Sequence, residues 1–228
     1  MVILRFCIKW KIFCKGSIFI VDFPLHREYP IPNIVNEKKF RQRFREVFDK
    51  TLIDKIINSE INQWSEVDWK GIMLKDGIVW INCDEGKIIA VNYQSEFEKK
   101  LRKDLIVKEK ENVHMSLKDF ESPAYKIKTK SYLIRVDKLS NGKYRYASWK
   151  IDERESLKPG IILNNGDLEF DGSVGNHIIT FINGNYTYKI WWCSKKYALF
   201  LNISKIDIKE RGQVNFLGSS CIFAEKKG

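Results

Sequence analysis

Two Asn-Gly pairs within residues 164–192 constrain the fold of this chain more than any other feature. Asn165-Gly166 and Asn183-Gly184 favour the type I′ hairpin turn, because both central residues of that turn need positive φ. β-Branched and aromatic runs at residues 168–170, 177–182 and 186–192 flank the two pairs. The pattern predicts antiparallel hairpins that place large apolar side chains on the sheet, among them Phe181, Tyr186, Tyr188 and Ile190.

The N-terminal half predicts helices that pack on a small sheet. Asn36 is a good N-cap, and Phe40, Phe44 and Val47 follow it at the spacing of one helical face, which we expect to lie in the core. Residues 52–57 continue this pattern as a second helix or as an extension of the first. After an expected loop at residues 64–68, apolar runs at 71–74, 78–82 and 87–93 are separated by Asp-Gly and Glu-Gly turns, which predicts a three-stranded meander.

A longer helix is expected to follow the meander. Ser95 and Glu98 match the Ser-x-x-Glu capping box, and the helix continues through Glu111. Its apolar stripe is thin, so we expect the helix to lie on the surface or to link two units. Beyond it we predict one strand over residues 125–136, a turn at Asn141-Gly142, a strand at 144–149 and final strands at 197–203 and 214–223.

Together these elements predict an α+β protein. N-terminal helices pack on an antiparallel meander, and an antiparallel β-sandwich or barrel-like module follows. We expect an apolar and basic segment at residues 1–29, an α+β unit at 30–120 and a β-rich module at 121–228. With 228 residues, of which 44% are hydrophobic, the chain can form one large domain or two small ones around a real core.

The chain is basic, with 40 Lys and Arg against 29 Asp and Glu and a formal net charge of +11. An excess of this size attracts polyanions such as nucleic acid, anionic lipid or glycan. The charges are intermixed rather than blocked, however, and an ordinary solvated surface has the same pattern. The partner is therefore open: another protein or an anionic polymer is expected, with nucleic acid as a less favoured candidate.

The cysteines and the N-terminus predict no metal site, no cofactor and no membrane span. The five cysteines form no Cys-x-x-Cys pair and no Cys/His cluster with zinc spacing, which favours buried free thiols. Basic residues interrupt residues 1–21, so no uncharged run reaches the roughly 20 residues that a span needs. The same segment lacks the clean apolar region of a signal peptide, so these residues predict no export.

His177 is the first candidate for a ligand contact, because it enters a predicted strand from a loop that contains two glycines. One interpretation makes His177 a ligand-binding or acid–base residue, with Ser173 and Asn176 beside it. The other is a loop histidine satisfied by local hydrogen bonds. The second is favoured, because the sequence places no acid or second histidine near it, and we predict no catalytic residue.

Aromatic residues beside basic ones form the second candidate surface. Tyr144, Tyr146 and Trp149 are interleaved with lysine and arginine, a composition that can stack bases or sugars. Strand alternation puts Tyr144 and Tyr146 on one face and Lys143 and Arg145 on the other. Because this separates the stacking groups from the charges, a core position is favoured over a ligand contact.

Two groups of segments resemble known folds. Residues 69–80, Trp-Lys-Gly-Ile-Met-Leu-Lys-Asp-Gly-Ile-Val-Trp, together with residues 87–93 resemble the end of the helix-plus-curved-sheet unit of NTF2-like or cystatin-like folds. Residues 144–149, 172–177 and 181–188 resemble a β-module of uncharacterised bacterial proteins, many of which look exported or lipid-anchored. The resemblance spans about residues 22–205 and implies an envelope, periplasmic or extracellular location, with a cytoplasmic one as the alternative. It brings no known activity and no site residue.

Three functional hypotheses follow. The leading one is a non-enzymatic binding or structural module at the bacterial envelope. The second is a cytoplasmic nucleic-acid-binding protein, motivated by the net charge and by the basic helix face at residues 38–45. The third is a small-molecule-binding or hydrolytic enzyme that uses an NTF2-like pocket, lined by Trp69, Trp80 and a carboxylate.

Overall fold

The computed structural model describes residues 21–67, 71–82, 85–171, 176–193, 198–207, 215–217 and 222–225. Most of the expected N-terminal segment 1–29 thus lies outside the described residues. The chain divides into two compact units, Met1–Asp104 and Leu105–Gly228, and the division falls within helix α4 (Glu96–Asn112). The three-part division expected from the sequence stays a prediction.

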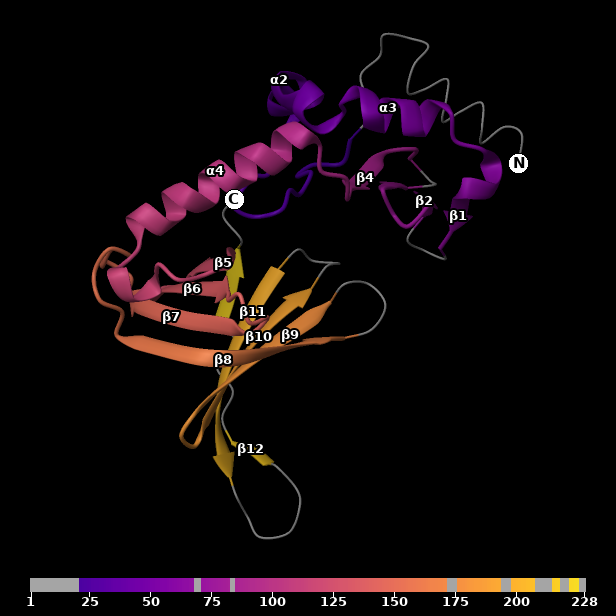
Figure 1. Ribbon diagram of the computed structural model, residues 1–228. Helices are drawn as coiled ribbons and strands as arrows, with labels where there is room; N and C mark the ends of the chain where they lie inside the picture. Colours follow the sequence, from indigo (N-terminus) through magenta and orange to yellow (C-terminus); the bar gives the residue numbers. More distant parts are fainter. Residues whose placement is uncertain are drawn as a thin grey trace. The chain divides into compact units, whose positions relative to one another are not determined.

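The described part of the first unit contains two short helices, the start of α4 and a four-stranded antiparallel sheet. Helices α2 (Glu37–Val47) and α3 (Lys50–Ile57) and the 3₁₀ turn η1 (Ile61–Gln63) precede the sheet in the chain. The strands pair in chain order: β1 (Trp64–Glu66), β2 (Ile72–Leu74), β3 (Val79–Ile81) and β4 (Ile88–Val91). Within this unit, α2 and α3 lie on one side of the sheet (Figure 1). The predicted packing of helices on an antiparallel meander is confirmed.

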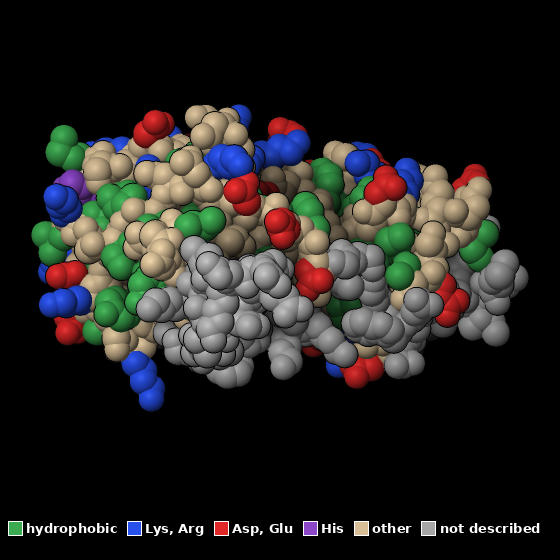
Figure 2. Space-filling view, turned by 90° about the horizontal axis from the view of Figure 1, so that it is seen from below, with side chains coloured by type: hydrophobic (Ala, Val, Ile, Leu, Met, Phe, Trp, Pro, Cys, Tyr) green, Lys and Arg blue, Asp and Glu red, His purple; other side chains and the backbone are tan. Residues whose placement is uncertain are grey.

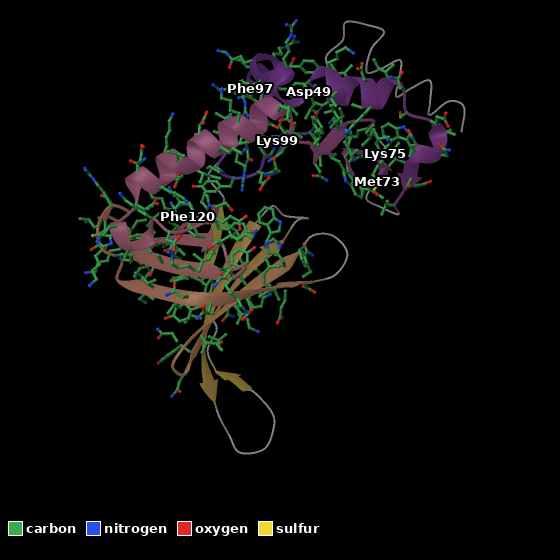
Figure 3. All side chains as sticks on the ribbon, viewed as in Figure 1. Asp49, Met73, Lys75, Phe97, Lys99 and Phe120 are labelled. Carbon is green, nitrogen blue, oxygen red and sulfur yellow. The ribbon has the colours of Figure 1, made fainter. Side chains whose placement is uncertain are left out.

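Both helices begin at a capping side chain and bury one apolar face. Asn36 Oδ1 accepts a 2.9 Å hydrogen bond from the Lys39 amide, and Asp49 Oδ1, at the start of α3 in Figure 3, accepts a 2.8 Å bond from the Leu52 amide. The apolar stripe of α2 lies in one core cluster with alternate residues of the strands. Met73 on β2 is only half-buried, because it alternates onto the opposite face of the sheet.

The prediction of a loop at residues 64–68 is wrong for its first three residues, because Trp64–Glu66 forms β1 and pairs with β2. The strand has three residues, of which only Trp64 is apolar, so it carries no alternating pattern. The two meander turns are confirmed. Gly77 lies at φ +80° and Gly86 at φ +63°, conformations that glycine adopts without strain.

A buried ion pair anchors the first turn of α4. Glu98 is fully buried, and its carboxylate accepts hydrogen bonds from Arg27 Nε, at 2.8 Å, and from Arg27 Nη2. The same guanidinium donates to the carbonyl oxygens of Val91 and Tyr93 at 2.6 and 2.7 Å. Ser95 Oγ accepts the Glu98 amide at 3.1 Å, which is the Ser95 half of the predicted capping box, while the Glu98 carboxylate accepts from Arg27. Glu98 is the one buried residue of α4, so the expected surface position of the helix is confirmed.

The second unit is one antiparallel sheet that curls on itself. A 3₁₀ turn, η3 (Met115–Leu117), leads into seven strands that pair in chain order: β5 (Ser122–Lys128), β6 (Tyr132–Lys138), β7 (Tyr144–Lys150), β8 (Ile161–Phe170), β9 (His177–Asn183), β10 (Tyr186–Cys193) and β11 (Ala198–Asp207). Two further strands, β12 (Asn215–Leu217) and β13 (Ile222–Glu225), both pair with β11. β13 also contacts β5, from the opposite end of the strand order, and Figure 1 shows the half-barrel that results. The predicted barrel-like module is confirmed.

The hairpin predicted at Asn183-Gly184 is confirmed, but its turn type differs. Asn183 pairs directly with Tyr186, so Gly184 and Asn185 form the two-residue loop between β9 and β10. Gly184 has φ +56°, whereas the described non-glycine residues with positive φ are Lys75 and Asn165. Glycine at the first loop position, followed by a residue with negative φ, is typical of type II′ rather than type I′.

The turn predicted at Asn165-Gly166 is wrong, because both residues lie inside β8. Asn165 adopts φ +61°, and the pairing of β7 with β8 shifts register between Tyr144 and Tyr146. Such a positive φ beside a register shift is typical of a β-bulge. An Asn-Gly pair marks a positive φ, and a bulge needs one as much as a turn does.

The single strand predicted over residues 125–136 is wrong, because a tight turn divides it into β5 and β6. Thr129 Oγ1 accepts hydrogen bonds from the amides of Ser131 and Tyr132 at 3.2 and 2.8 Å. The threonine hydroxyl thus supplies the turn chemistry that glycine or proline more often provides.

The two faces of the curled sheet carry separate cores. The inner core consists of Tyr125, Ile127, Ile134, Val136, Tyr146, Leu163, Ile179, Phe181, Tyr188, Ile190, Leu199 and Leu201. The outer core consists of Val113, Leu117, Phe120, Ala147 and Trp149. Phe120 lies between α4 and the sheet (Figure 3), and Lys110 Nζ and the Arg135 guanidinium each lie 4.9 Å from its ring centre.

Candidate ligand-binding site

Four side chains from four strands meet at one end of the inner face of the curled sheet. Phe170 on β8 and Trp192 on β10 are the pairing neighbours of His177 on β9. Tyr125 on β5 reaches the same place because the sheet curls. We call Tyr125, Phe170, His177 and Trp192 the aromatic–histidine cluster.

Ring contacts and one hydrogen bond hold this cluster together. The Tyr125 ring is nearly parallel to the rings of His177 and Trp192, with centroid distances of 5.9 and 6.2 Å. Phe170 meets His177 edge to face at 6.0 Å. The Tyr125 hydroxyl is hydrogen-bonded to His177 Nε2. Stacked and edge-to-face geometries of this kind are the favourable ones for aromatic rings.

Burial keeps the Tyr125 hydroxyl protonated at neutral pH. Desolvation, with the nearby Tyr144 as a second cause, raises the pKa of Tyr125 well above its ordinary value. The hydroxyl is therefore protonated at neutral pH, and it donates to His177 Nε2 or accepts from it according to the tautomer of the imidazole.

Exposure increases across the cluster from the core to the solvent. Tyr125 is buried, His177 and Trp192 are half-buried, and Phe170 is 74% exposed. A ligand from solution can therefore reach Phe170 and the partly exposed sides of His177 and Trp192. The buried Tyr125 ring stacks against the rings of His177 and Trp192.

The structure places Asn176 beside His177, directly before β9. Asn176 is half-buried, and its carbonyl oxygen accepts a 2.8 Å hydrogen bond from the Asp171 amide. This bond closes the loop that joins β8 to β9. Ser173 lies outside the described residues, so its predicted role stays a prediction.

The other three predicted contacts do not share one surface. Tyr146 is 3% exposed on the inner face, with the rings of Phe181 and Tyr188 at 5.8 and 5.5 Å. Trp149 is 1% exposed on the outer face and donates from Nε1 to the Leu157 carbonyl at 2.8 Å. Tyr144 is half-buried at the edge of the inner core. Their role as ligand contacts stays a prediction.

Burial also sets the protonation of these tyrosines. It raises the pKa of Tyr146 to about 12 and shifts that of Tyr144 in the same direction. Both hydroxyls are thus protonated at neutral pH. They serve as neutral hydrogen-bonding groups of the inner face and not as bases.

The sequence pattern did not indicate Tyr125 or Phe170, and it indicated Trp192 only as one of a set of aromatic residues beside basic ones, not as a neighbour of His177. Phe170 and Trp192 lie beside His177 because they pair with it on the two neighbouring strands. A correct prediction of the strand register would have identified both. Tyr125 lies 52 residues before His177, and only the curl of the sheet brings the two together. No local pattern carries that information.

The described part of the chain shows neither a metal site nor a membrane-spanning helix. There, no three His, Cys, Asp or Glu side chains come together as a metal site would require. Among the helices described, none combines the length and the hydropathy needed to cross a membrane.

No family model matches the chain, and neither a curated protein nor a solved structure matches it. The likeness to NTF2-like and cystatin-like folds therefore rests on the sequence segments alone. The ligand contact is therefore inferred from the geometry of the described residues.

Proposed function

We propose that this protein is a non-enzymatic binding module whose ligand contact is the aromatic–histidine cluster. The observation that carries the proposal is the meeting of Tyr125, Phe170, His177 and Trp192 at one end of the sheet, with Phe170 74% exposed. Aromatic rings with a few polar groups among them hold ligands by ring contact and hydrogen bonds.

The charges around Phe170 favour a neutral ligand with a ring, such as a sugar. Asp171 directly follows Phe170 at the end of β8, and Glu169 precedes it on the opposite face of the strand; both are exposed. Carboxylates at these positions repel phosphate groups, which disfavours a nucleic acid at this site. A sugar ring offers an apolar face for Phe170 and hydroxyls for polar groups.

A location at the bacterial envelope belongs to the same proposal. Its support is the resemblance of residues 144–149, 172–177 and 181–188 to modules that look exported or lipid-anchored. The enzymatic alternative places a pocket at Trp69 and Trp80. Trp69 lies outside the described residues, and Trp80 is half-buried with its indole against Gly77.

Oligosaccharide binding by the wild type and by Phe170→Ala tests the proposal. The probes are neutral oligosaccharides, such as chitohexaose and maltohexaose, titrated into the protein while tryptophan fluorescence reports on binding. Truncation of a central aromatic contact costs about 1–2 kcal/mol, so Phe170→Ala should bind roughly 5–30-fold more weakly. Phe170 is mostly exposed, so the fold should tolerate its loss.

Ile182→Ala is the matched control. Ile182 is 68% exposed on β9, and it alternates with Phe181 onto the outer face, away from the cluster. Its affinity should equal that of the wild type. Equal loss in both variants, or unchanged affinity in Phe170→Ala, would contradict the assigned contact. Turnover of an oligosaccharide that His177→Ala abolishes would contradict a non-enzymatic role.

A further inference from the structure

Helix α2 concentrates positive charge more than the other described helices do. It carries five Lys and Arg against two Glu, an excess of three, whereas α3 and α4 each have an excess of one. The acids of α2 are already engaged: Glu37 pairs with Arg41 at 2.8 Å, and Glu46 pairs with Arg43 at 2.7 Å. The helix therefore keeps an uncompensated positive charge.

Three cations account for this excess: Lys38, Lys39 and Arg45. All three are exposed, and none has an acidic partner within 4.0 Å among the described residues. Lys38 and Arg45 are seven residues apart, which places them on the same side of the helix and about 10 Å apart along its axis. Arg41 lies between them, and its exposed pair with Glu37 is weak enough for a competing anion to displace.

The chemistry of this face identifies the kind of anion. The three phenylalanines of α2 and its C-cap, Phe40, Phe44 and Phe48, pack into the core and offer no ring to an unstacked base. The exposed residues of α2 include no apolar side chain that could enter a lipid interface. Cations without rings or apolar anchors suit regularly spaced backbone phosphates.

We propose that the exposed basic face of α2, formed by Lys38, Arg41 and Arg45, binds the backbone phosphates of duplex nucleic acid without regard to base sequence. This site lies in the first unit and is independent of the aromatic–histidine cluster. By contrast, the face of the molecule in Figure 2 intermixes basic and acidic side chains, a pattern that produces no strong field of one sign.

The salt dependence of duplex binding tests the proposal. The probe is a fluorescently labelled DNA duplex of about 20 base pairs, followed by anisotropy at about 50 and 200 mM salt. Three phosphate contacts give a slope of about −2.7 in log affinity against log salt, so affinity should fall roughly 40-fold between the two conditions. The double variant Lys38→Gln/Arg45→Gln should reduce the size of the slope by about 1.8.

Lys128→Gln/Lys130→Gln is the matched control, because it removes the same net charge. Both lysines are exposed, at the end of β5 and in the turn that follows. We expect this variant to keep the wild-type slope. Circular dichroism of each variant checks that the fold is intact, and glutamine preserves helix propensity at positions 38 and 45.

Three outcomes would overturn the proposal. Equal changes of slope in both double variants would assign binding to net charge alone. No duplex binding at about 50 mM salt would remove the site. Binding to vesicles of anionic phospholipid without binding to the duplex would assign the face to a membrane surface. None of these outcomes affects oligosaccharide binding, so the proposed ligand contact is tested separately. Tight duplex binding would, however, count against the proposed location at the bacterial envelope.

Discussion

Six charged side chains form one connected network on the outer side of the curled sheet: Lys126, Arg135, Asp137, Arg145, Glu109 and Glu155. Asp137 accepts from Arg135 at 2.8 Å and from Arg145 at 3.1 Å. Arg135 also donates to Glu109 and Glu155 at 2.5 and 2.9 Å. Three positive and three negative groups balance. Removing one member would leave a partner buried without compensation, which makes the network a structural feature of the unit.

Glu109 gives this network a measurable dependence on pH. Burial alone would raise the pKa of Glu109, but the hydrogen bond from Arg135 and the charges of Lys126 and Arg135 lower it below its ordinary value. A carboxyl whose pKa is lowered by folding contributes stability above its unfolded pKa of about 4.3, and that contribution is lost as the pH falls through the folded pKa.

We therefore expect Glu109→Gln to lower the free energy of unfolding at neutral pH and to flatten its fall in acid. The window begins near the unfolded pKa of about 4.3 and extends below it, to the pH at which the folded protein protonates Glu109. Urea unfolding followed by circular dichroism at several pH values measures both effects. Parallel curves for wild type and variant over this window would show that Glu109 does not carry the dependence.

At the scale of elements, Gly166 shows how closely the strands of the inner face approach one another. Gly166 lies beside the bulge at Asn165, and its φ is not among the positive values of the described residues. Glycine is needed at this position because it has no side chain, whereas a Cβ would overlap the ring of Phe181. A methyl group there must displace a side chain that is 1% exposed.

Gly166→Ala should therefore destabilise the second unit by about 1–3 kcal/mol, the usual cost of overpacking a core. Urea unfolding measures this loss, and the double variant with Phe181→Leu should lose less than the sum of the two single variants. Gly160→Ala is the comparison, because Gly160 has no positive φ and the atom nearest to an added Cβ is the Ser148 carbonyl oxygen at 3.8 Å. Strict additivity of Gly166→Ala and Phe181→Leu would contradict the proposed overlap.

The elements differ in how well local sequence predicted them. The helices were predictable because Asn36 caps α2 and its phenylalanines recur at helical spacing. β1 and the β5–β6 turn were not, since one has a single apolar residue and the other depends on a threonine hydroxyl. Asn165-Gly166 misled because a bulge, like a turn, can require a positive φ, which Asn165 adopts.

At the scale of the whole molecule, the α+β class followed from the order of the elements, whereas the candidate site did not. His177 was identified from the sequence by its position after a glycine-containing loop, but the sequence did not indicate which residues contact it. Its neighbours come from β5, β8 and β10, so they follow from the pairing and curl of the complete sheet. A site assembled across a curled sheet is a property of topology, which local patterns do not encode.

We expect the ligand to bind at the aromatic–histidine cluster. The three histidines of the chain allow a direct test of this site. His26 lies in the first unit, His114 caps η3, and His177 lies in the cluster. Three imidazole signals can be assigned by single substitutions in a proton NMR spectrum. Titration with the oligosaccharide that binds most tightly should shift the His177 signal and leave those of His26 and His114 in place. Binding that shifts His26 or His114 while His177 stays unmoved would contradict the claim.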